Sequence, residues 1–308
     1  MKQTKIAFLG CGAVGMSSLY AALQQNLASE YGLLDVFADP RDGNVLDFQD
    51  ACSFLREGSN VKAYDYHDLK DVDIIVISAG LPQKPEQTRL ELIEDNRKII
   101  EEIGRKIKSS GFTGITIMVS NPVDLMTYHY IKATGFDHNR VIGSGTVLDS
   151  SRLRYFIGSD LNISPIDIQG YVIGEHGDSS LVAFSAISIN GIPLRHFKSK
   201  YNDSNYETDL ETPIRRKAYE IIKRKRATFY GIGGGVAKLI RAIVYDSKQI
   251  IACGPLLHGE YGYQDIVFGT PCVIGANGIE KILELPLNEK EKAKLKNSVE
   301  VLKSYLMK

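Results

Sequence analysis

The chain has 308 residues, of which 44% are hydrophobic and 24% charged, as in a globular protein with one large core or two domains. Lys plus Arg and Asp plus Glu both number 37, so no net field favours nucleic acid or an anionic membrane as a partner. The apolar run Ile6–Leu9 is too short for a signal peptide, and no apolar stretch reaches membrane-spanning length. Four scattered cysteines without metal-ligand spacing fit a reducing compartment. We expect a cytoplasmic protein without a metal.

A glycine-rich turn follows the first predicted strand, Lys5–Leu9, and opens a predicted helix from Val14 to Leu27. The glycines are Gly10, Gly12 and Gly15, spaced as G-x-G-x-x-G. Between a strand and a helix, this motif predicts a dinucleotide site, because the glycines let the backbone approach a pyrophosphate that the helix N-terminus favours.

The second predicted strand, Leu33–Ala38, ends at Asp39, about twenty residues beyond the glycine motif. A carboxylate at this place accepts hydrogen bonds from both ribose hydroxyls and repels a 2′-phosphate. The sequence therefore predicts NAD rather than NADP, and only the neighbouring Arg41 favours NADP.

Two further predicted strands, Val72–Ser78 and Ile115–Ser120, enclose a long helix, Leu90–Lys108. Strands that alternate with helices predict a parallel sheet with helices on both faces and ligands at the carboxyl ends of its strands. The small and polar residues at those ends are Gly80, Asn121 and, after the short strand Val141–Ile142, Ser144. Taken alone, Asn121–Pro122 is equally compatible with an ordinary turn.

The connection Leu81–Arg89 is polar and rich in proline, and it lies over the same edge of the predicted sheet. It is either a plain loop or a lid that excludes water and brings in a charge when it closes. Arg89 is the candidate for that charge.

The second half of the chain has a different pattern. The turns Asn190–Gly191 and Asn277–Gly278 and the segment Tyr261–Tyr263 predict antiparallel hairpins, and Leu181–Ile189 is the strand expected before the first turn. Helices are expected at Pro213–Lys225, at Gly233–Tyr245 and after Asn288, where Glu291 completes a capping box ahead of the apolar stripe Leu295, Val299, Leu302 and Leu306. The expected fold class is α/β: a doubly wound parallel NAD-binding Rossmann sheet in residues 1–143, then an α+β substrate domain with antiparallel hairpins in residues 144–308.

Two features of this half are candidates for chemistry. His176 stands between two glycines at the end of the apolar run in Tyr171–Asp178, and it is either a catalytic acid/base or a turn histidine bonded to backbone. Asp149 and Arg152 share a helix face, so Asp149 either fixes the tautomer of His176 or forms a surface ion pair, which is the usual role of an isolated D-x-x-R. The basic cluster at residues 215–226 is interpreted as a solvated helix face rather than a phosphate or nucleic-acid site.

A set of segments in this order resembles the L-lactate and malate dehydrogenase family, and most closely the bacterial L-lactate and L-2-hydroxyisocaproate dehydrogenases. The resemblance covers nearly the whole chain. The segments are Gly10–Gly15, Gln83–Pro85 with Thr88–Leu90, Val119–Asp124, Val141–Thr146, Leu148–Arg152, Gly174–Ser180 and Gly259–Gly262.

The resemblance implies a role for each candidate. Arg152 binds the substrate carboxylate in a bidentate contact. His176, held by Asp149, donates a proton to the keto oxygen while hydride passes from NADH to C2, and Arg89 arrives with the lid to polarise the carbonyl. Asn121 and Thr228 complete the substrate site. The residues implied around NAD are Gly10, Gly12, Val14, Gly15, Asp39, Gly80, Val119, Asn121 and Ser144.

Gln83 occupies the position that sets substrate choice in the family. Malate dehydrogenases generally have an arginine there, so oxaloacetate beside a neutral glutamine leaves a buried charge unpaired, at a cost of about 3–5 kcal/mol. Malate is therefore disfavoured, and a 2-oxo or 2-hydroxy monocarboxylic acid is expected. The preferred substrates are pyruvate and L-lactate. Bulkier 2-oxo acids are the alternative, because one methylene group changes binding by only about 1–3 kcal/mol.

Three departures from lactate dehydrogenases keep that alternative open. Lys84–Gln87 replaces the common Lys-Pro-Gly-Glu of the lid, and Asp47–Ala51 resembles the hydroxyisocaproate branch. The glycine-rich segment Ile232–Val236 either widens the pocket or eases helix packing. In contrast, the lid lacks the insertion associated with the hydroxyisocaproate branch.

The resemblance also bears on regulation and assembly. Many bacterial lactate dehydrogenases bind fructose 1,6-bisphosphate between subunits through an arginine and a histidine. Arg154 matches the arginine, but Gln169 stands where the histidine is expected, so we expect weak or absent activation. The family forms homo-oligomers, and a tetramer is expected in preference to a dimer. A non-catalytic NAD-binding protein is the alternative from another class, but the retained catalytic side chains argue against it.

Overall fold

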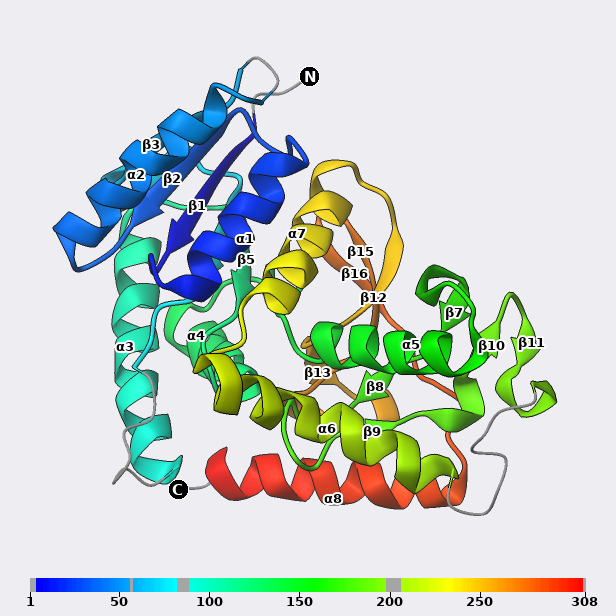
Figure 1. Ribbon diagram of the computed structural model, residues 1–308. Coiled ribbons are helices and arrows are strands. Elements are labelled where there is room, and N and C mark those ends of the chain that lie inside the picture. Colours follow the sequence, from blue (N-terminus) through cyan, green and yellow to red (C-terminus); the bar gives the residue numbers. More distant parts are fainter. Residues whose placement is uncertain (1–3, 56–57, 82–88, 198–205, 307–308) are drawn as a thin grey trace.

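The computed structural model describes residues 4–55, 58–81, 89–197 and 206–306 (Figure 1). The first half of the chain is built on a parallel sheet with the strand order β3-β2-β1-β4-β5-β6. The strands are β1 (Lys5–Leu9), β2 (Glu30–Leu34), β3 (Asn60–Ala63), β4 (Ile74–Ile77), β5 (Ile115–Met118) and β6 (Val141–Gly143). The order reverses direction between β1 and β4, as in a doubly wound sheet, so ligands are expected at the carboxyl ends of these two strands.

Both faces of this sheet are buried. Ala7 and Leu9 of β1 point into one apolar cluster. Ile6 and Phe8 point into a second cluster on the other face. The side chains of β4 alternate in the same way, which explains why the central strands are apolar throughout rather than alternately polar.

Helices cover each face. The first cluster contains side chains of α3 (Arg89–Ser109) and α4 (Val123–Thr134). The second contains side chains of α1 (Ala13–Gln24), α2 (Ala38–Cys52) and α7 (Tyr230–Val244), although α7 comes from the second half of the chain. Figure 1 shows α7 lying alongside α1, which joins the two halves through a shared core.

The glycines of α7 allow this close packing. A Cβ atom at Gly233 would lie 2.9 Å from the main-chain carbon and oxygen of Ser17 in α1. A Cβ atom at Gly235 would lie 3.0 Å from the side chain of Val147, whereas one at Gly234 would meet nothing within 4 Å. Of the two explanations for Ile232–Val236, helix packing is therefore the one that these contacts support.

The second half combines short antiparallel strands with helices. It contains α5 (Val147–Leu161), β7 (Ile168–Gln169), β8 (Val172–Ile173), β9 (Leu181–Val182), β10 (Ser188–Ile189), β11 (Ile192–Pro193), α6 (Tyr206–Lys225), β12 (Gln249–Cys253), β13 (Leu256–His258), β14 (Gln264–Val267), β15 (Thr270–Gly275), β16 (Gly278–Ile282) and α8 (Glu289–Leu306). Antiparallel pairs β10/β11, β13/β14 and β15/β16 lie at the three predicted hairpins. This confirms the expected fold class.

Some boundaries differ from those expected. The single strand Leu181–Ile189 is wrong, because Ser185 turns toward α8 and donates its backbone N–H to Glu291 (2.9 Å), which separates β9 from β10. Helix α6 begins at Tyr206, so Pro213 lies inside it rather than at its start. The capping box of α8 is confirmed: Asn288 and Glu291 each accept the other's backbone N–H at 2.9 Å. No helix in the described part of the chain is both long and apolar enough to cross a bilayer.

Candidate active site

The glycine turn after β1 leaves room for a phosphate group. Gly10 has a φ of 104°, and a Cβ atom there would lie 2.7 Å from the backbone nitrogen of Ala79. A Cβ atom at Gly15 would collide with the carbonyl oxygen of Gly10. Gly12 caps α1, and a Cβ atom there would meet nothing within 4 Å. The N-terminus of α1 has no side-chain cap and no acidic residue in its first turn, so neither competes with a pyrophosphate for its N–H groups.

The carboxylate at the end of β2 is Asp35 and not Asp39. The strand stops at Leu34, four residues before the predicted end, and Asp39 is exposed in the first turn of α2. Asp35 accepts the backbone N–H of Cys11 in the glycine turn at 2.6 Å and that of Phe37 at 3.0 Å. The prediction that Asp39 directly follows the second strand is therefore wrong. The sequence signal that identifies Asp35 is its place directly after the buried apolar run.

The other predicted cofactor residues lie at the carboxyl ends of the strands. Gly80 follows β4, Val119 and Asn121 follow β5, and Ser144 follows β6. Val14, Gly12 and Gly15 belong to the turn and first residues of α1. Because the strands are parallel, these ends form one edge of the sheet.

Asn96 of α3 joins two of these loops, and the sequence did not point to it. Its side-chain oxygen accepts the N–H of Leu81 at 2.7 Å, and its amide donates to the carbonyl of Asn121 at 2.9 Å. Asn96 is buried, so this bond fixes the start of the Leu81–Arg89 connection against the loop after β5. The peptide bond between Asn121 and Pro122 is cis.

His176, Asp149 and Arg152 form one hydrogen-bonded group, in which Asp149 and Arg152 are buried and His176 is partly exposed. One oxygen of Asp149 lies 2.6 Å from Nδ1 of His176, and the other accepts a hydrogen bond from Nη1 of Arg152 at 2.9 Å. The side chains of Asp149 and Arg152 are 10% and 8% exposed, whereas that of His176 is 27% exposed. The D-x-x-R pair is therefore not a surface ion pair, and His176 is not held by backbone alone.

Electrostatics favour a proton on His176. Burial by itself lowers the pKa of this imidazole, but the charge and the hydrogen bond of Asp149 and the charge of Asp124 raise it to about 9. Burial by itself raises the pKa of Asp149, but the net shift is downward because His176 and Arg152 stabilise its ionised form. Both directions describe an imidazolium–carboxylate pair at neutral pH.

A further carboxylate, Asp124 of α4, accepts the backbone N–H of His176 at 2.7 Å. Asp124 is only three residues beyond Asn121, so this bond joins the loop after β5 to the acid–base group. Asp124 lies in the segment Val119–Asp124 that carries the family resemblance, but the sequence indicates no role for it, because the contact spans 52 residues of sequence.

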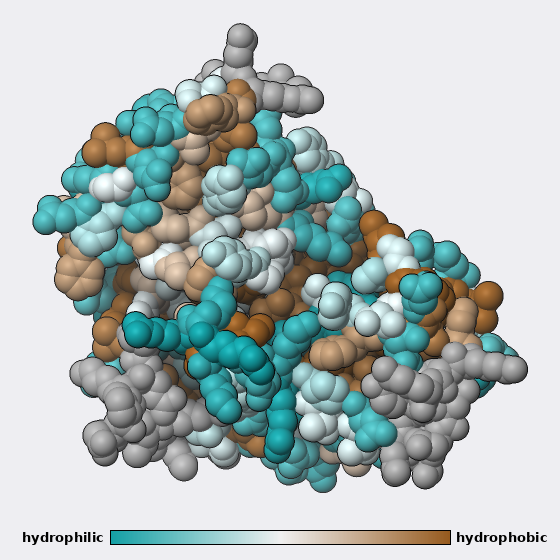
Figure 2. Space-filling model, in the orientation of Figure 1, coloured by the Kyte–Doolittle hydropathy of each residue, from teal (hydrophilic) through white to brown (hydrophobic). Residues whose placement is uncertain are grey.

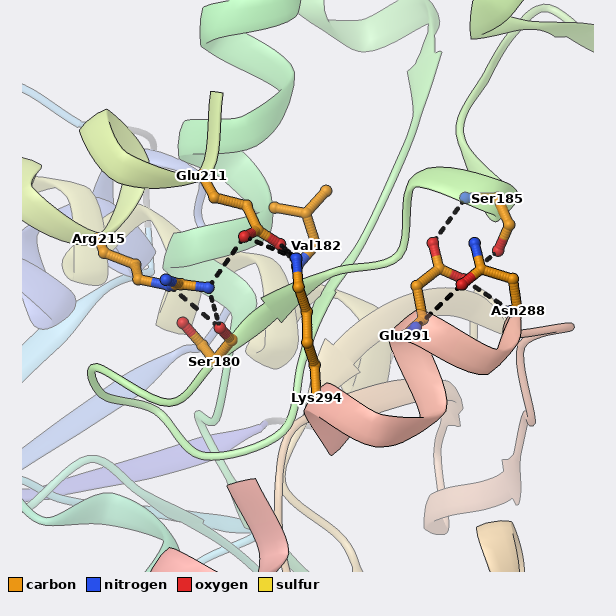
Figure 3. A network of polar contacts seen from close by, with 8 residues as sticks. All are labelled: Ser180, Val182, Ser185, Glu211, Arg215, Asn288, Glu291 and Lys294. Atoms are coloured by element: carbon orange, nitrogen blue, oxygen red, sulfur yellow. Dashed lines mark hydrogen bonds and ion pairs between the residues drawn. The ribbon is translucent and has the colours of Figure 1, made fainter. Parts of the chain in front are cut away.

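A polar network supports the segment that follows His176 (Figure 3). Glu211 of α6 accepts hydrogen bonds from Arg215 (3.1 Å), from Lys294 of α8 (2.8 Å) and from the N–H of Val182 (3.3 Å). Arg215 also donates to the carbonyl of Ser180 at 2.8 Å. The two helices thus hold β9 from opposite sides, and the loop that ends at Ser180 carries His176.

The basic cluster at residues 215–226 has a half-buried part and an exposed part. Arg215 is half-buried in the network above, so the solvated-face prediction is wrong for this residue. The side chains of Lys223, Arg224, Lys225 and Arg226 are exposed. Figure 2 shows hydrophilic side chains gathered over this end of α6, which agrees with a solvated face.

The remaining predicted substrate residues are Gln83, Arg89 and Thr228. Gln83 lies outside the described residues, and of Arg89 only the backbone is described, at the first position of α3. Thr228 is half-buried in the connection between α6 and α7.

Comparison with known proteins identifies two matching family models. The model of the lactate/malate dehydrogenase NAD-binding domain matches residues 4–143. The model of the lactate/malate dehydrogenase alpha/beta C-terminal domain matches residues 146–308. Together they cover nearly the whole chain.

Individual relatives agree with this match. The chain is 53% identical to an L-lactate dehydrogenase of Mesomycoplasma hyopneumoniae over 304 residues, which are 98% of this chain and 96% of the relative. It is 51% identical to an L-lactate dehydrogenase of Mycoplasma pneumoniae over 308 residues, which are 99% and 98% of the two chains. Among solved structures, a ligand-bound minor L-lactate dehydrogenase of Enterococcus mundtii superimposes with a TM-score of 0.96 at 36% identity, covering 99% of this chain and 98% of that one.

These findings confirm the resemblance drawn from the sequence, the Rossmann-type fold and the NAD cofactor. They also confirm the expected enzyme class, an NAD-dependent 2-hydroxyacid dehydrogenase of the L-lactate type. The chain belongs to the lactate/malate dehydrogenase family.

Proposed function

We propose that this enzyme interconverts pyruvate and L-lactate in fermentative pyruvate metabolism, with His176 as the group that donates and accepts the proton. The observation that carries the proposal is the carboxylate of Asp149, which holds the imidazole of His176 through one oxygen (2.6 Å) and the guanidinium of Arg152 through the other (2.9 Å). A 2-oxo acid has a carboxylate and a keto oxygen on adjacent carbons. A guanidinium fork beside a proton donor is complementary to that pair.

The residues at the sheet edge fit NAD. The open space at Gly12 and the free N-terminus of α1 fit a pyrophosphate. The carboxylate of Asp35 fits an adenosine ribose. We assign the ribose contact to Asp35 in place of Asp39. Arg41 gives little reason to expect NADP, because its Nε lies 2.7 Å from Asp42. The remaining proposed contacts are Gly10, Val14, Gly15, Gly80, Val119, Asn121 and Ser144. When bound, NADH supplies the hydride that reduces C2 of the substrate.

The protein's own residues control the proton. Nδ1 of His176 donates to Asp149, which leaves Nε2 as the atom that gives its proton to the keto oxygen. Asp149 stabilises the imidazolium and does not take the proton, because its own pKa is lowered. In the reverse direction the neutral imidazole accepts the hydroxyl proton of L-lactate.

The two arginines and the polar residues of the pocket bind the rest of the substrate. Arg152 uses Nη1 for Asp149, and its planar fork has further N–H groups for the substrate carboxylate. From the family resemblance, we assign Arg89 to polarisation of the carbonyl, and Asn121, Gln83 and Thr228 to orientation and specificity. A neutral Gln83 disfavours oxaloacetate.

The preference for pyruvate over bulkier 2-oxo acids rests on two points. The relatives that share about half of the residues are L-lactate dehydrogenases. The packing of Gly233 against Ser17 also gives a reason for the glycine-rich segment other than a wider pocket. The hydroxyisocaproate-type activity remains the alternative because of the Asp47–Ala51 segment.

We also infer a homo-oligomer, a tetramer in preference to a dimer, that works in the cytoplasm. Apolar side chains stand exposed on and beside α2, for example Leu46 at 65% and Phe54 at 90%, and burial in an interface would remove them from water. All four cysteines are free thiols, as a reducing compartment requires. Analytical ultracentrifugation measures the subunit number directly.

Replacement of His176 by Asn tests the proposed role. We expect turnover of pyruvate and NADH to fall by about 100-fold or more, because the acid–base group contributes about 10²–10⁴-fold. NADH affinity should stay the same, because the glycine turn and Asp35 are untouched. His67→Asn is the control, since its side chain is 79% exposed and far from the site in sequence. Full turnover in the His176→Asn enzyme contradicts the proposal.

A further inference from the structure

We propose that Asp124 is a positioning residue for the reaction: it anchors the main chain of His176, and its negative charge stabilises the protonated imidazole. The proposal rests on the role of His176 given above. It adds to the Asp149–His176 pair a second carboxylate, which approaches the histidine from the NAD-binding half of the molecule.

The geometry places Asp124 between the two halves of the site. It lies in the first turn of α4, and only 3% of its surface is exposed. One oxygen accepts the backbone N–H of His176 at 2.7 Å. The other oxygen is buried and has no hydrogen-bond partner among the described residues. A role limited to holding the loop does not explain why a carboxylate stands here, because a neutral side chain accepts one N–H equally well and leaves no buried charge.

The surrounding charges show what the carboxylate contributes. The charged groups that act on Asp124 are His176, Glu175 of the same loop and Asp149 of α5. The charge of Arg152, also on α5, opposes the protonation of His176. Asp124 therefore helps to balance the repulsion between two cations, the guanidinium that binds substrate and the imidazolium that must carry a proton beside it.

The pKa values of both groups are compatible with this balance over the interval in which His176 titrates. Burial raises the pKa of Asp124 to about 7, while the hydrogen bond and the charge of His176 lower it. Asp124 is therefore ionised near pH 9, where His176 loses its proton. Burial lowers the pKa of His176, and the charge of Asp124 raises it, in the same direction as the larger effect of Asp149. Neutralising Asp124 should therefore lower the pKa of His176 and leave Asp149 in place.

The experiment compares Asp124→Asn with Ser298→Ala. Asn keeps the shape and a carbonyl oxygen for the N–H of His176 but has no charge. Ser298 of α8 is the matched control, because its hydroxyl accepts the neighbouring N–H of Glu175 at 2.8 Å and it carries no charge at all. Asp124→Ser, which keeps a hydroxyl acceptor, is the second variant if Asn does not fold at this position.

Two readouts are measured for each variant as a function of pH. One is kcat/KM for pyruvate, which reports the protonation of the NADH-bound enzyme before substrate binds. The other is the titration of the His176 ring, followed by NMR of 13C-labelled histidine and assigned with His176→Asn. We expect the pKa of His176 to fall by about 1 unit in Asp124→Asn, as for the loss of a nearby opposite charge, and to stay unchanged in Ser298→Ala.

Two results overturn the proposal: an unchanged pKa of His176 in both Asp124 variants, or an equal shift in Ser298→Ala, which would show that loop position and not charge is responsible. These results can be told apart from failure of the proposed function. If the proposed function fails, the His176→Asn enzyme keeps its turnover. If only the proposal for Asp124 fails, the His176→Asn enzyme loses turnover but the Asp124 variants leave the pKa of His176 unchanged.

Discussion

At the scale of single residues, the site depends on carboxylates that serve two partners each. Asp149 joins His176 to Arg152, so the proton donor and the carboxylate-binding group have a fixed separation before substrate arrives. Asp35 joins the glycine turn to the end of β2 in the same manner. Such shared anions pre-organise a site, because no side chain has to be reoriented when the ligand binds.

The cofactor assignment is tested by Asp35→Asn, with Asp39→Asn as its control. Asp35→Asn should weaken NADH binding by about tenfold and reduce the preference for NADH over NADPH, since a charged hydrogen bond to ribose is worth about 1.5–3 kcal/mol. Asp39→Asn should leave both affinities unchanged, because Asp39 is exposed on α2. Fluorescence titration with the two nucleotides measures this. If Asp39→Asn weakens NADH binding more than Asp35→Asn does, Asp39 and not Asp35 binds the ribose.

The pH dependence of the wild-type enzyme follows from the raised pKa of His176, about 9. The imidazole must be protonated to reduce pyruvate, so kcat/KM for pyruvate should be constant near neutral pH and fall as pH rises through about 9. Lactate oxidation needs the neutral imidazole and should rise over the same interval. Steady-state rates in both directions measure the two limbs. A pyruvate limb that begins to fall near the ordinary histidine pKa contradicts the effect of Asp149.

Several site residues were predictable from sequence because they are fixed by local spacing. The glycines of the turn follow a strand, and Asp149 and Arg152 are three positions apart on one helix. The contact between His176 and Asp149 spans 27 residues, so only the family resemblance predicted it. Asp124 and Asn96 were missed for the same reason: their partners are distant in sequence, and nothing local identifies a buried polar side chain of this kind.

At the scale of helices and strands, the site stands where elements from the two halves pack together. Helix α7 lies against α1, directly behind the glycine turn, and α6 and α8 hold β9 through Glu211, Arg215 and Lys294. The central strands were predicted well, because a strand buried on both faces is apolar throughout. The end of β2 and the start of α6 were predicted wrongly, because tertiary contacts decide where a helix or strand begins and ends.

The packing of α7 gives a matched pair of substitutions. Gly233→Ala places a methyl group 2.9 Å from the backbone of Ser17 and should destabilise the fold by about 1–3 kcal/mol, as overpacking does. Gly234→Ala meets nothing within 4 Å and should be neutral or stabilising by up to about 1 kcal/mol, because alanine favours helix. Chemical denaturation compares the two variants. Equal effects contradict the assignment of this segment to helix packing.

At the scale of the whole molecule, the two halves form a joined structure. Gly143, the last residue of β6, and Gly254 exchange both backbone hydrogen bonds, at 2.9 and 2.8 Å. The division into residues 1–143 and 144–308 remains a prediction, as does the tetramer. The exposed apolar side chains of the α2 region belong to this scale, because the proposed oligomer would cover them.

The regulatory prediction concerns fructose 1,6-bisphosphate. Gln169 is exposed on β7 and accepts the N–H of Asn190 at 3.1 Å, so it offers a phosphate no positive charge. The sugar bisphosphate should change the KM for pyruvate by less than about twofold at neutral pH, because phosphate binding depends on charge-assisted hydrogen bonds. A large fall in KM on its addition contradicts this expectation, and Gln169→His then tests whether the missing histidine matters.

The most direct test of the central claim is the rate of NADH oxidation by the purified enzyme with pyruvate, 2-oxobutyrate, 2-oxoisocaproate, phenylpyruvate and oxaloacetate, compared as kcat/KM. We predict that pyruvate has the highest value and that oxaloacetate is hundreds-fold or more lower, because a neutral Gln83 supplies no charge to pair with its second carboxylate. Higher values for the branched or aromatic acids would make this a broader L-2-hydroxyacid dehydrogenase. A preference for oxaloacetate, or no oxidation of NADH with any of them, would contradict the assignment of Arg152, His176 and Gln83.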